Sequence, residues 1–507
     1  MLKKLLEKLK TIDTKITFLW VISVLVIFGC LCFFFINAHP MYIFDTDDWM
    51  YISRTRLGIP IPGYWNPTRV LPEIMFPLSA EFGIDFIMPF THDYIGSIAV
   101  GCALSLCVLA TAYITFFAMF IKKEYKPLNA VGIMFLFFVA ILQFLPFFSE
   151  YYNFSHMFYA SNVTCVFFYV CSGMVNAILV FVLWTNEKIN WRDKNKVFVN
   201  GLLILLMFLS VNSNLFQSII SASFAGVVLL ERLIVNLTDK NKESRKKVWE
   251  WIVYNLDYII YVCAWFVSVA LEGTGGRAEY GSGNFTDNVK TEIKIFVLSM
   301  SKLNKYFLLA SVACIVGAII LCLLSLVRKN KTQSEIKFIR YFLRSLVCFI
   351  INGVFLILLC SKVNTGYMYY SWVLWGAVFF VMLMMIVSME YIFEKIPQLM
   401  ILLPLAIFVL CTEVVITRTD YCDIYEPQTS KLIDDDIVNQ VLEAQSKGET
   451  VVKVHIPKCQ SPLWPYDTIG SGSEKMSNSL YRHNIIKQPM TIIFEPDGEM
   501  NKKYNYY

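Results

Sequence analysis

Charged residues are scarce in this chain. Asp, Glu, Lys and Arg make up 16% of its 507 residues, whereas a soluble protein usually contains roughly a quarter. This scarcity argues against a soluble enzyme. Apolar runs replace the missing charges, and eleven of them approach the ~20 residues that cross a bilayer. We therefore expect an all-α polytopic integral membrane protein with about 11 transmembrane helices, at 17–36, 94–121, 129–148, 161–184, 197–211, 215–231, 250–271, 306–327, 341–360, 372–393 and 398–416.

Signatures of soluble cofactor and metal sites are also missing. The chain has no Walker loop and no glycine-rich dinucleotide fingerprint, which disfavours a soluble nucleotide as a group donor. None of its 5 histidines and 14 cysteines stands at metal-ligand spacing. Most cysteines lie in apolar runs. Cys422 and Cys459 lie apart in the tail, where a disulfide and two free thiols both remain open.

Lysine and arginine mark one side of the membrane. No cleavage pattern follows the first apolar run, so we expect that run to remain as an anchor. Basic residues cluster before it and at alternate connections between runs, which places the N-terminus in the cytoplasm. An odd number of spans then places the C-terminus outside. The net charge of +5 is mostly this topological signal, so we infer no nucleic-acid partner.

The predicted topology divides the chain into three parts. Residues 1–16 form a cytoplasmic tail, 17–416 form the transmembrane domain, and 417–507 form an extracytoplasmic module. Two outer loops of the transmembrane domain, 37–93 and 272–305, are long enough to hold a site.

The tail has the patterns of a small α/β module. Residues 434–446 place apolar side chains on one face of a helix and end before a glycine. Residues 451–456 alternate between polar and apolar, and 490–494 are also strand-like.

An acidic cluster follows the first apolar run: Asp45, Asp47 and Asp48, with Trp49 next in the chain. Three carboxylates at the edge of a bilayer are costly unless water, a cation or a substrate meets them. Neighbouring acids also raise one another's proton affinity, so one of them can act as a general base. The cluster therefore marks a candidate active site.

Helix capping is the other open interpretation of this cluster. The acids would then cap a helix that lies along the membrane interface over 48–59, with Trp49, Tyr51 and Ile52 as anchors. Prolines at 60, 62, 67 and 72 predict an irregular, extended path beyond it.

Arginines on the outer side run against the inside-positive bias. Arg54, Arg56 and Arg69 lie in the first outer loop, and Arg277 lies in a glycine-rich stretch of the second. A guanidinium binds phosphate through paired hydrogen bonds and offsets the charge of a phosphate leaving group. The alternative for each arginine is a structural ion pair, with Glu73, Asp85, Glu272 or Glu279.

Aromatic residues gather on the outer side, where aromatic belts mark any membrane interface. Trp65 and Tyr152 are candidates for stacking on a sugar, because they neighbour Arg69 and Glu150. His156 follows in the same segment and is a candidate neighbour of the acidic cluster. A solvent-facing or hydrogen-bonded histidine is its simpler interpretation.

Together these features resemble the GT-C glycosyltransferases. The resemblance covers the architecture of the whole chain, and its residues are Asp47-Asp48-Trp49, Trp65 through Arg69, and Gly275-Gly276-Arg277. It looks closest to the bacterial branch that decorates surface polysaccharides, including O-antigen glucosyltransferases. The resemblance implies a multi-pass protein of the bacterial cytoplasmic membrane. It also implies inverting transfer of a sugar from a polyprenyl-phosphate carrier, such as undecaprenyl phosphate, to a hydroxyl of a glycan or lipid-linked acceptor.

The resemblance also implies roles for individual residues. Asp47 or Asp48 would be the general base, assisted by Asp45, and Arg69 and Arg277 would hold the donor phosphate. The other residues implied for the substrate site are Trp49, Arg54, Trp65, Glu150, Tyr152 and His156. Related enzymes work with or without a divalent cation, so Mg²⁺ or Mn²⁺ held by the three aspartates stays open. The main alternative function is a transporter or flippase of a lipid-linked saccharide, which calls for more charged groups inside the bundle than this chain has.

Overall fold

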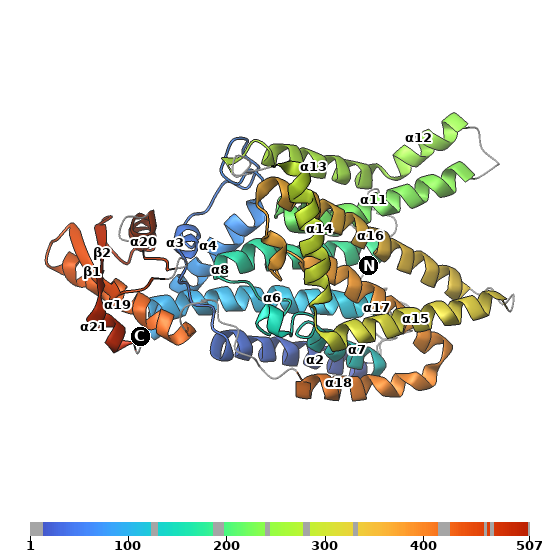
Figure 1. Cartoon of the computed structure of the whole chain (residues 1–507), viewed down its shortest axis with the longest axis horizontal. Helices are drawn as coiled ribbons and strands as arrows, with labels where there is room; N and C mark the ends of the chain where they lie inside the picture. Colours follow the sequence, from blue (N-terminus) through green and yellow to red (C-terminus); the bar gives the residue numbers. More distant parts are fainter. Residues whose placement is uncertain are drawn as a thin grey trace.

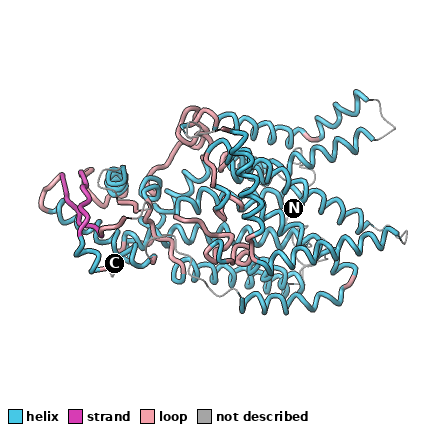
Figure 2. Tube along the Cα trace, in the orientation of Figure 1, coloured by secondary structure: helices cyan, strands magenta, loops and turns pink. Residues whose placement is uncertain are grey.

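Helices make up most of the chain in the computed structural model, which describes residues 14–122, 130–185, 197–238, 244–276, 284–327, 333–413, 426–460, 464–466 and 471–504. Figure 1 shows a bundle of long helices with a smaller group of elements at one end. Figure 2 shows that the described strands belong to this smaller group. The expectation of a mostly helical, polytopic membrane protein is confirmed at this level.

Seven helical stretches of the described residues are long and apolar enough to cross a membrane. Their backbone polar groups are satisfied within each helix, which is what a hydrocarbon environment demands. The elements are α2 (Thr14–Phe33) with the π-helix η1 (Phe34–Ala38), α6 (Tyr94–Lys122), α8 (Val163–Cys165) with η3 (Val166–Cys171) and α9 (Ser172–Thr185), α11 (Leu215–Thr238), α15 (Lys305–Val327), α16 (Gln333–Val363) and α17 (Trp375–Lys395).

The remaining predicted spans correspond to shorter or bent helices. α7 (Ala130–Leu142), α10 (Val197–Val211) and α18 (Leu402–Glu413), which follows η7 (Pro397–Ile401), are shorter than a bilayer requires. α12 (Ser244–Tyr254) and α13 (Leu256–Glu272) qualify only as one pair bent by 77°. The described residues thus support seven spans, or eight with the bent pair, and the count of 11 is not confirmed. Which end of the bundle faces the cytoplasm stays a prediction.

The last part of the first outer loop forms a helical hairpin with α6, the helix that follows it. α4 (Val70–Phe86) and the short α5 (Met88–Thr91) lead into α6, and α4 packs antiparallel against it. A Cβ atom at Gly83 would lie 2.1 Å from the Ser97 carbonyl oxygen, and one at Gly101 would lie 2.3 Å from that of Ser79. Only glycine permits so close an approach of two backbones. This crossing fixes α4, and with it the position of Arg69 at its start.

The predicted interfacial helix over 48–59 is wrong in both length and surroundings. α3 (Thr46–Tyr51) ends after 6 residues, and the chain then continues without a helix to Arg69. The predicted anchors Trp49, Tyr51 and Ile52 are 1%, 5% and 0% exposed. They are buried because the C-terminal elements cover α3.

The described residues after 426 form α19 (Pro427–Ser446), β1 (Val451–Pro457), α20 (Ser471–Arg482), β2 (Thr491–Asp497) and α21 (Gly498–Lys503). The two strands are parallel, with Val451 opposite Thr491. The helix and both strands predicted for the tail are present as α19, β1 and β2. In β1 the alternating burial of the side chains follows the alternating sequence. Figure 1 places the group beside α3. Its location outside the membrane stays a prediction.

Three further described elements lie between the long helices: η2 (Glu150–Tyr152), α14 (Phe285–Ser301) and η6 (Tyr367–Tyr369). Figure 1 shows α14 running across the bundle rather than along it.

A buried hydrogen-bond network ties four helices of the bundle together. Ser210 of α10 and Ser221 of α11 both donate to Asn176 Oδ1 of α9 at 2.5 Å. The Tyr261 hydroxyl of α13 lies 2.8 Å from Ser210 Oγ and 2.5 Å from Ser221 Oγ. Lipid gives apolar helices no hydrophobic reason to associate, so such bonds hold the bundle. These bonds fix the helices that hold the loops at the end of the bundle.

Candidate functional site

The acidic cluster caps α3. The Asp45 side chain accepts a hydrogen bond from the Asp47 backbone N–H at 2.8 Å, and Asp48 Oδ2 accepts from the Asp45 N–H at 3.3 Å. This reciprocal arrangement is a capping box, and it satisfies N–H groups that no helical carbonyl reaches. The capping interpretation of the cluster is therefore confirmed for Asp45 and Asp48, whereas their catalytic roles stay predictions.

Asp48 also fastens α3 to the bundle. Its Oδ1 accepts from the backbone N–H and the hydroxyl of Thr164 in α8, at 2.7 and 2.6 Å. Oδ2 accepts a further bond from the Phe44 N–H at 3.2 Å. Burial, helped by the charge of Asp45, raises the pKa of Asp48 to about 7, and the donors at Thr164 and Phe44 oppose this rise. Both oxygens of this buried carboxylate are therefore already occupied by protein donors.

Asp47 differs from the other two acids because it is accessible. Its side chain is 49% exposed, and its nearest ion-pair partner is Lys475 Nζ of α20, at 3.8 Å. The Asp45 side chain is more enclosed, and burial followed by the neighbouring Asp47 charge raises its pKa. Of the three acids, Asp47 therefore has the most accessible side chain.

Helix α20 covers α3 from the other side. Ser479 Oγ donates to the Trp49 carbonyl oxygen at 2.6 Å and lies 2.8 Å from Ser53 Oγ. The Thr46 hydroxyl donates to the Pro465 carbonyl oxygen at 3.0 Å. Trp49, which the resemblance implies for the substrate site, is only 1% exposed here, so its ring supports α3 from inside.

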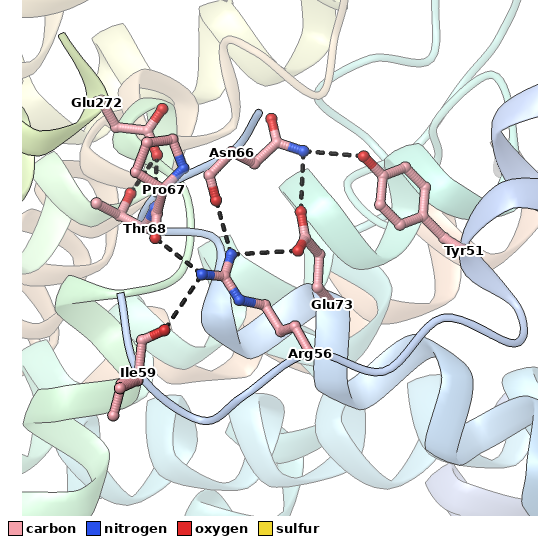
Figure 3. A network of polar contacts seen from close by, with 8 residues as sticks. All are labelled: Tyr51, Arg56, Ile59, Asn66, Pro67, Thr68, Glu73 and Glu272. Carbon is pink, nitrogen blue, oxygen red and sulfur yellow. Dashed lines mark hydrogen bonds and ion pairs between the residues drawn. The ribbon is translucent and has the colours of Figure 1, made fainter. Parts of the chain in front are cut away.

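Arg56 is the centre of a fully described polar network, shown in Figure 3. Its two terminal amino groups donate four hydrogen bonds, to Glu73 Oε2 at 3.2 Å and to the carbonyl oxygens of Asn66, Ile59 and Pro67. The Asn66 amide donates to the other Glu73 oxygen and to the Tyr51 hydroxyl, both at 2.9 Å. Among the structural pairings considered for the arginines, Arg56 with Glu73 is thus confirmed.

Arg69 has no such partner. It stands at the N-terminus of α4, is 5% exposed, and lies over the Phe168 ring with 5.3 Å between its guanidinium carbon and the ring centre. The charge of Arg69 acts on Glu73. Within the described residues, however, its guanidinium forms no hydrogen bond and no ion pair. Arg54 is similar, since its described contact is the Tyr64 ring at 5.7 Å.

The glycine-rich loop packs directly on the first outer loop. Glu272 Oε1 accepts hydrogen bonds from the Thr68 backbone N–H, at 2.9 Å, and from the Thr68 hydroxyl (Figure 3). A Cβ atom at Gly276 would lie 2.5 Å from the Trp65 ring, and one at Gly275 would lie 2.6 Å from Pro67. Only glycine permits this contact. Two outer segments far apart in sequence therefore meet beside Arg69, whereas Arg277 itself lies outside the described residues.

The acids and the unpaired arginine approach the same stretch of one helix. Asp48 binds Thr164, and Arg69 lies over Phe168, four residues further along. Four helical residues advance about 6 Å, so the two groups share one end of the bundle. Trp65, which is 42% exposed, lies in the same loop as Arg69, and its role in stacking on a sugar stays a prediction.

Glu150, Tyr152 and His156 lie elsewhere in this end of the bundle. The Tyr152 hydroxyl donates to the Ser299 carbonyl oxygen at 2.9 Å. His156 is buried against Phe34 and other rings, and burial lowers its pKa well below the usual value. In the part of the chain that the structure describes, none of the three forms a hydrogen bond or ion pair with the acidic cluster or Arg69.

A cation held by all three aspartates stays an untested possibility. The described residues contain no group of three or more His, Cys, Asp or Glu side chains placed to hold a metal ion. Both oxygens of Asp48 accept N–H or O–H donors, and the Asp47 carboxylate faces the ammonium group of Lys475. The positive charge beside the acids is thus supplied by lysine.

Several residues of this region gave no signal in the sequence. Thr164, Lys475, Asn66 and Ser479 are ordinary polar residues, and their partners lie in other segments of the chain. Of the two tail cysteines, Cys459 is half-buried and Cys422 lies outside the described residues, so their pairing stays untested.

Comparison with known proteins gave no relative for this chain. No protein-family model, no curated protein and no solved structure matches it. The likeness to GT-C glycosyltransferases therefore rests on the motifs quoted above, and the site must be judged by its own chemistry.

Proposed function

We propose that this chain is an inverting glycosyltransferase at the outer face of a bacterial cytoplasmic membrane. The donor is a sugar carried by a polyprenyl phosphate, and the acceptor is a hydroxyl of a glycan or lipid-linked saccharide. Arg69 and Arg54 bind the donor phosphate, and Asp47 accepts the proton of the attacking hydroxyl. The resemblance assigns Arg277 to the same phosphate site; the described glycines before it, Gly275 and Gly276, pack on Pro67 and Trp65.

The observation that carries this proposal is that Arg69 is buried without a described hydrogen-bond acceptor. A buried guanidinium is costly unless a counter-charge meets it, and Arg56 has that counter-charge in Glu73. Arg69 has a ring face and, within the described residues, no hydrogen-bond acceptor. A phosphate supplies both the negative charge and the paired oxygens that a guanidinium binds. A substrate that carries phosphate would therefore supply the hydrogen-bond acceptors that Arg69 lacks among the described residues.

The reaction assigns each group a role. The acceptor oxygen attacks the anomeric carbon, and the bond from that carbon to the phosphate oxygen breaks on the opposite face, which inverts the configuration. The proton of the hydroxyl passes to Asp47. The electron pair of the broken bond stays on the carrier phosphate, where the arginines stabilise its charge. Asp45 and Asp48 position Asp47 by holding the first turn of α3.

Release of carrier phosphate tests the proposal. The purified protein, in nanodiscs with a panel of polyprenyl-phosphate hexoses and a saccharide acceptor, should form free polyprenyl phosphate and a glycosidic product. Arg69→Lys keeps the charge but loses the paired hydrogen bonds, so it should lower this rate about 10²-fold to 10³-fold. Arg482→Lys is the matched control, because Arg482 is exposed and donates to the Ser53 carbonyl oxygen, an acceptor that lysine can also use.

Two outcomes would overturn the assignment. Equal rates for wild type and Arg69→Lys would remove the phosphate-binding role of Arg69. Movement of an intact lipid-linked saccharide across a vesicle membrane, without release from any donor of the panel, would favour the flippase alternative.

A further inference from the structure

Three arginines gather at the end of the bundle opposite α3 and the C-terminal elements. Arg232 lies near the end of α11, and Arg340 and Arg344 lie near the start of α16; Figure 1 shows these helix ends on the far side from α3. Glu231 of α11 forms an ion pair with Arg340 Nε at 3.0 Å and accepts a hydrogen bond from Arg344 Nε at 2.6 Å. The cluster is thus built from two helices around one carboxylate.

Arg232 lies beside this pair of arginines. It donates to Asn255 Oδ1 at 2.7 Å and lies over the Tyr258 ring at 4.8 Å, and the charge of Arg344 reaches the same tyrosine. Two guanidinium groups, those of Arg340 and Arg344, share the Glu231 carboxylate. Arg340 and Arg344 use only their Nε atoms, so their terminal amino groups have no acceptor within the described residues.

Arg344 is too deeply placed for water to balance its charge. It is 6% exposed and packs under the Trp184 ring, 6.0 Å from the ring centre. Burial of a cation that lacks a full set of partners is unfavourable, so an anion that uses the free amino groups would stabilise the cluster.

The cluster also lies where a membrane changes from polar to apolar. Arg344 is the last charged residue before the uncharged stretch 345–361 of α16. In α11 the stretch 215–230 is uncharged up to Glu231, and its 16 residues extend about 24 Å. Apolar residues beside the arginines are exposed, including Val235 at 60% and Leu343 at 49%. Phosphate groups of lipids lie at this level, with acyl chains beside them.

We propose that Arg340 and Arg344, beside Arg232, form a binding site for a single phosphate group, supplied by an anionic phospholipid. The fork of Arg340 and that of Arg344 take the phosphate oxygens, and the acyl chains lie along Val235 and Leu343. The site is distinct from the proposed active site, which is at the other end of the bundle, and it does not depend on the proposed function.

Lipid retention tests this site. We expect native mass spectrometry to find phosphatidylglycerol retained at least about fivefold more than phosphatidylcholine by the full-length protein. Arg340→Gln should abolish this preference, because it removes the more exposed guanidinium, whose side chain is 45% accessible, without emptying a buried position. Lys290→Gln is the control, since Lys290 is an exposed cation of α14 that pairs with Asp287 at 3.1 Å. Arg344→Gln should give the same loss as Arg340→Gln, and if it fails to fold the Arg340 variant decides.

A second arm separates the two sources of phosphate. Inorganic phosphate should raise the melting temperature in phosphatidylcholine nanodiscs much less than phosphatidylglycerol does. Equal stabilisation by inorganic phosphate, lost in Arg340→Gln, would assign the site to a soluble phosphate and overturn the lipid source. The absence of a preference for phosphatidylglycerol, or a preference that Arg340→Gln retains, would overturn the site itself.

Discussion

Two neighbouring regions of the first outer loop bury a guanidinium in opposite ways. Arg56 donates four hydrogen bonds from its terminal amino groups and pairs with Glu73, whereas Arg69, 5% exposed, has a ring face and no described acceptor. Their sequence contexts look alike. The difference teaches that burial alone does not separate a structural arginine from one kept for a ligand, and that the separation comes from counting acceptors.

The largest effect is expected from a change to an acid. Asp48 and Asp47 differ as the two arginines do, because Asp48 is buried with protein partners and Asp47 is accessible. Asp47→Asn should lower the transfer rate by about 10²-fold to 10⁴-fold, the usual contribution of a general base. Its free energy of unfolding should hardly change, because the side chain is half exposed and pairs with Lys475 only at 3.8 Å. Rates from the carrier-phosphate assay and unfolding curves in detergent check both parts. Full activity of Asp47→Asn would remove the base from the proposal.

The contrast between the two arginines predicts different costs in stability. Arg56→Ala leaves Glu73 buried without its counter-charge and should lower the free energy of unfolding by about 3–5 kcal/mol. Arg69→Ala removes a cation that has no described acceptor, so it should cost clearly less. Denaturant titration of both variants in the same detergent gives the comparison. Equal losses would mean that Arg69 is as structural as Arg56.

A smaller effect is expected in the pH dependence of stability. The pKa of Asp48 is raised to about 7 in the folded protein, against about 4 in an unfolded chain. Between these values the folded protein holds the extra proton, so this group stabilises the fold below about pH 4 and loses that contribution as pH rises through about 7. The advantage of wild type over Asp48→Asn in unfolding free energy should therefore be larger at about pH 5 than at about pH 8. The buried histidines occur in both proteins and cancel in this difference.

The smallest effect is expected from removal of divalent cations. Because both oxygens of Asp48 accept protein donors and Lys475 faces Asp47, EDTA should leave the transfer rate unchanged. The rate with and without added Mg²⁺ or Mn²⁺ checks this. A requirement for either cation would show that the aspartates rearrange when substrate binds.

The sequence was a good guide where one local pattern decides the structure. Apolar runs predicted the helices of the bundle, because a long uncharged run in a membrane has no alternative to a helix. Alternation predicted β1, and the acidic cluster predicted a helix cap. Each of these depends on neighbours within a few residues.

The sequence was a poor guide where distant segments decide. The helix predicted at 48–59 ends at Tyr51 in the structure, where α20 and α8 enclose α3, and neither contact is visible in the loop itself. Glu73 was one of four possible partners for an arginine, and only the fold selects Arg56 for it. Most of what surrounds the candidate site could therefore not be predicted from its own segment.

The contact of α20 with α3 has a consequence for how the protein is made. Asp47 is synthesised before the described helices from α4 to α18, whereas Lys475 and Ser479 of α20 are synthesised after them. The acidic turn therefore remains without its cover while those helices are made. A product that stops before α20 would carry those helices and still present an uncovered acidic turn, so the packing of α20 on α3 is a late step in forming a working molecule.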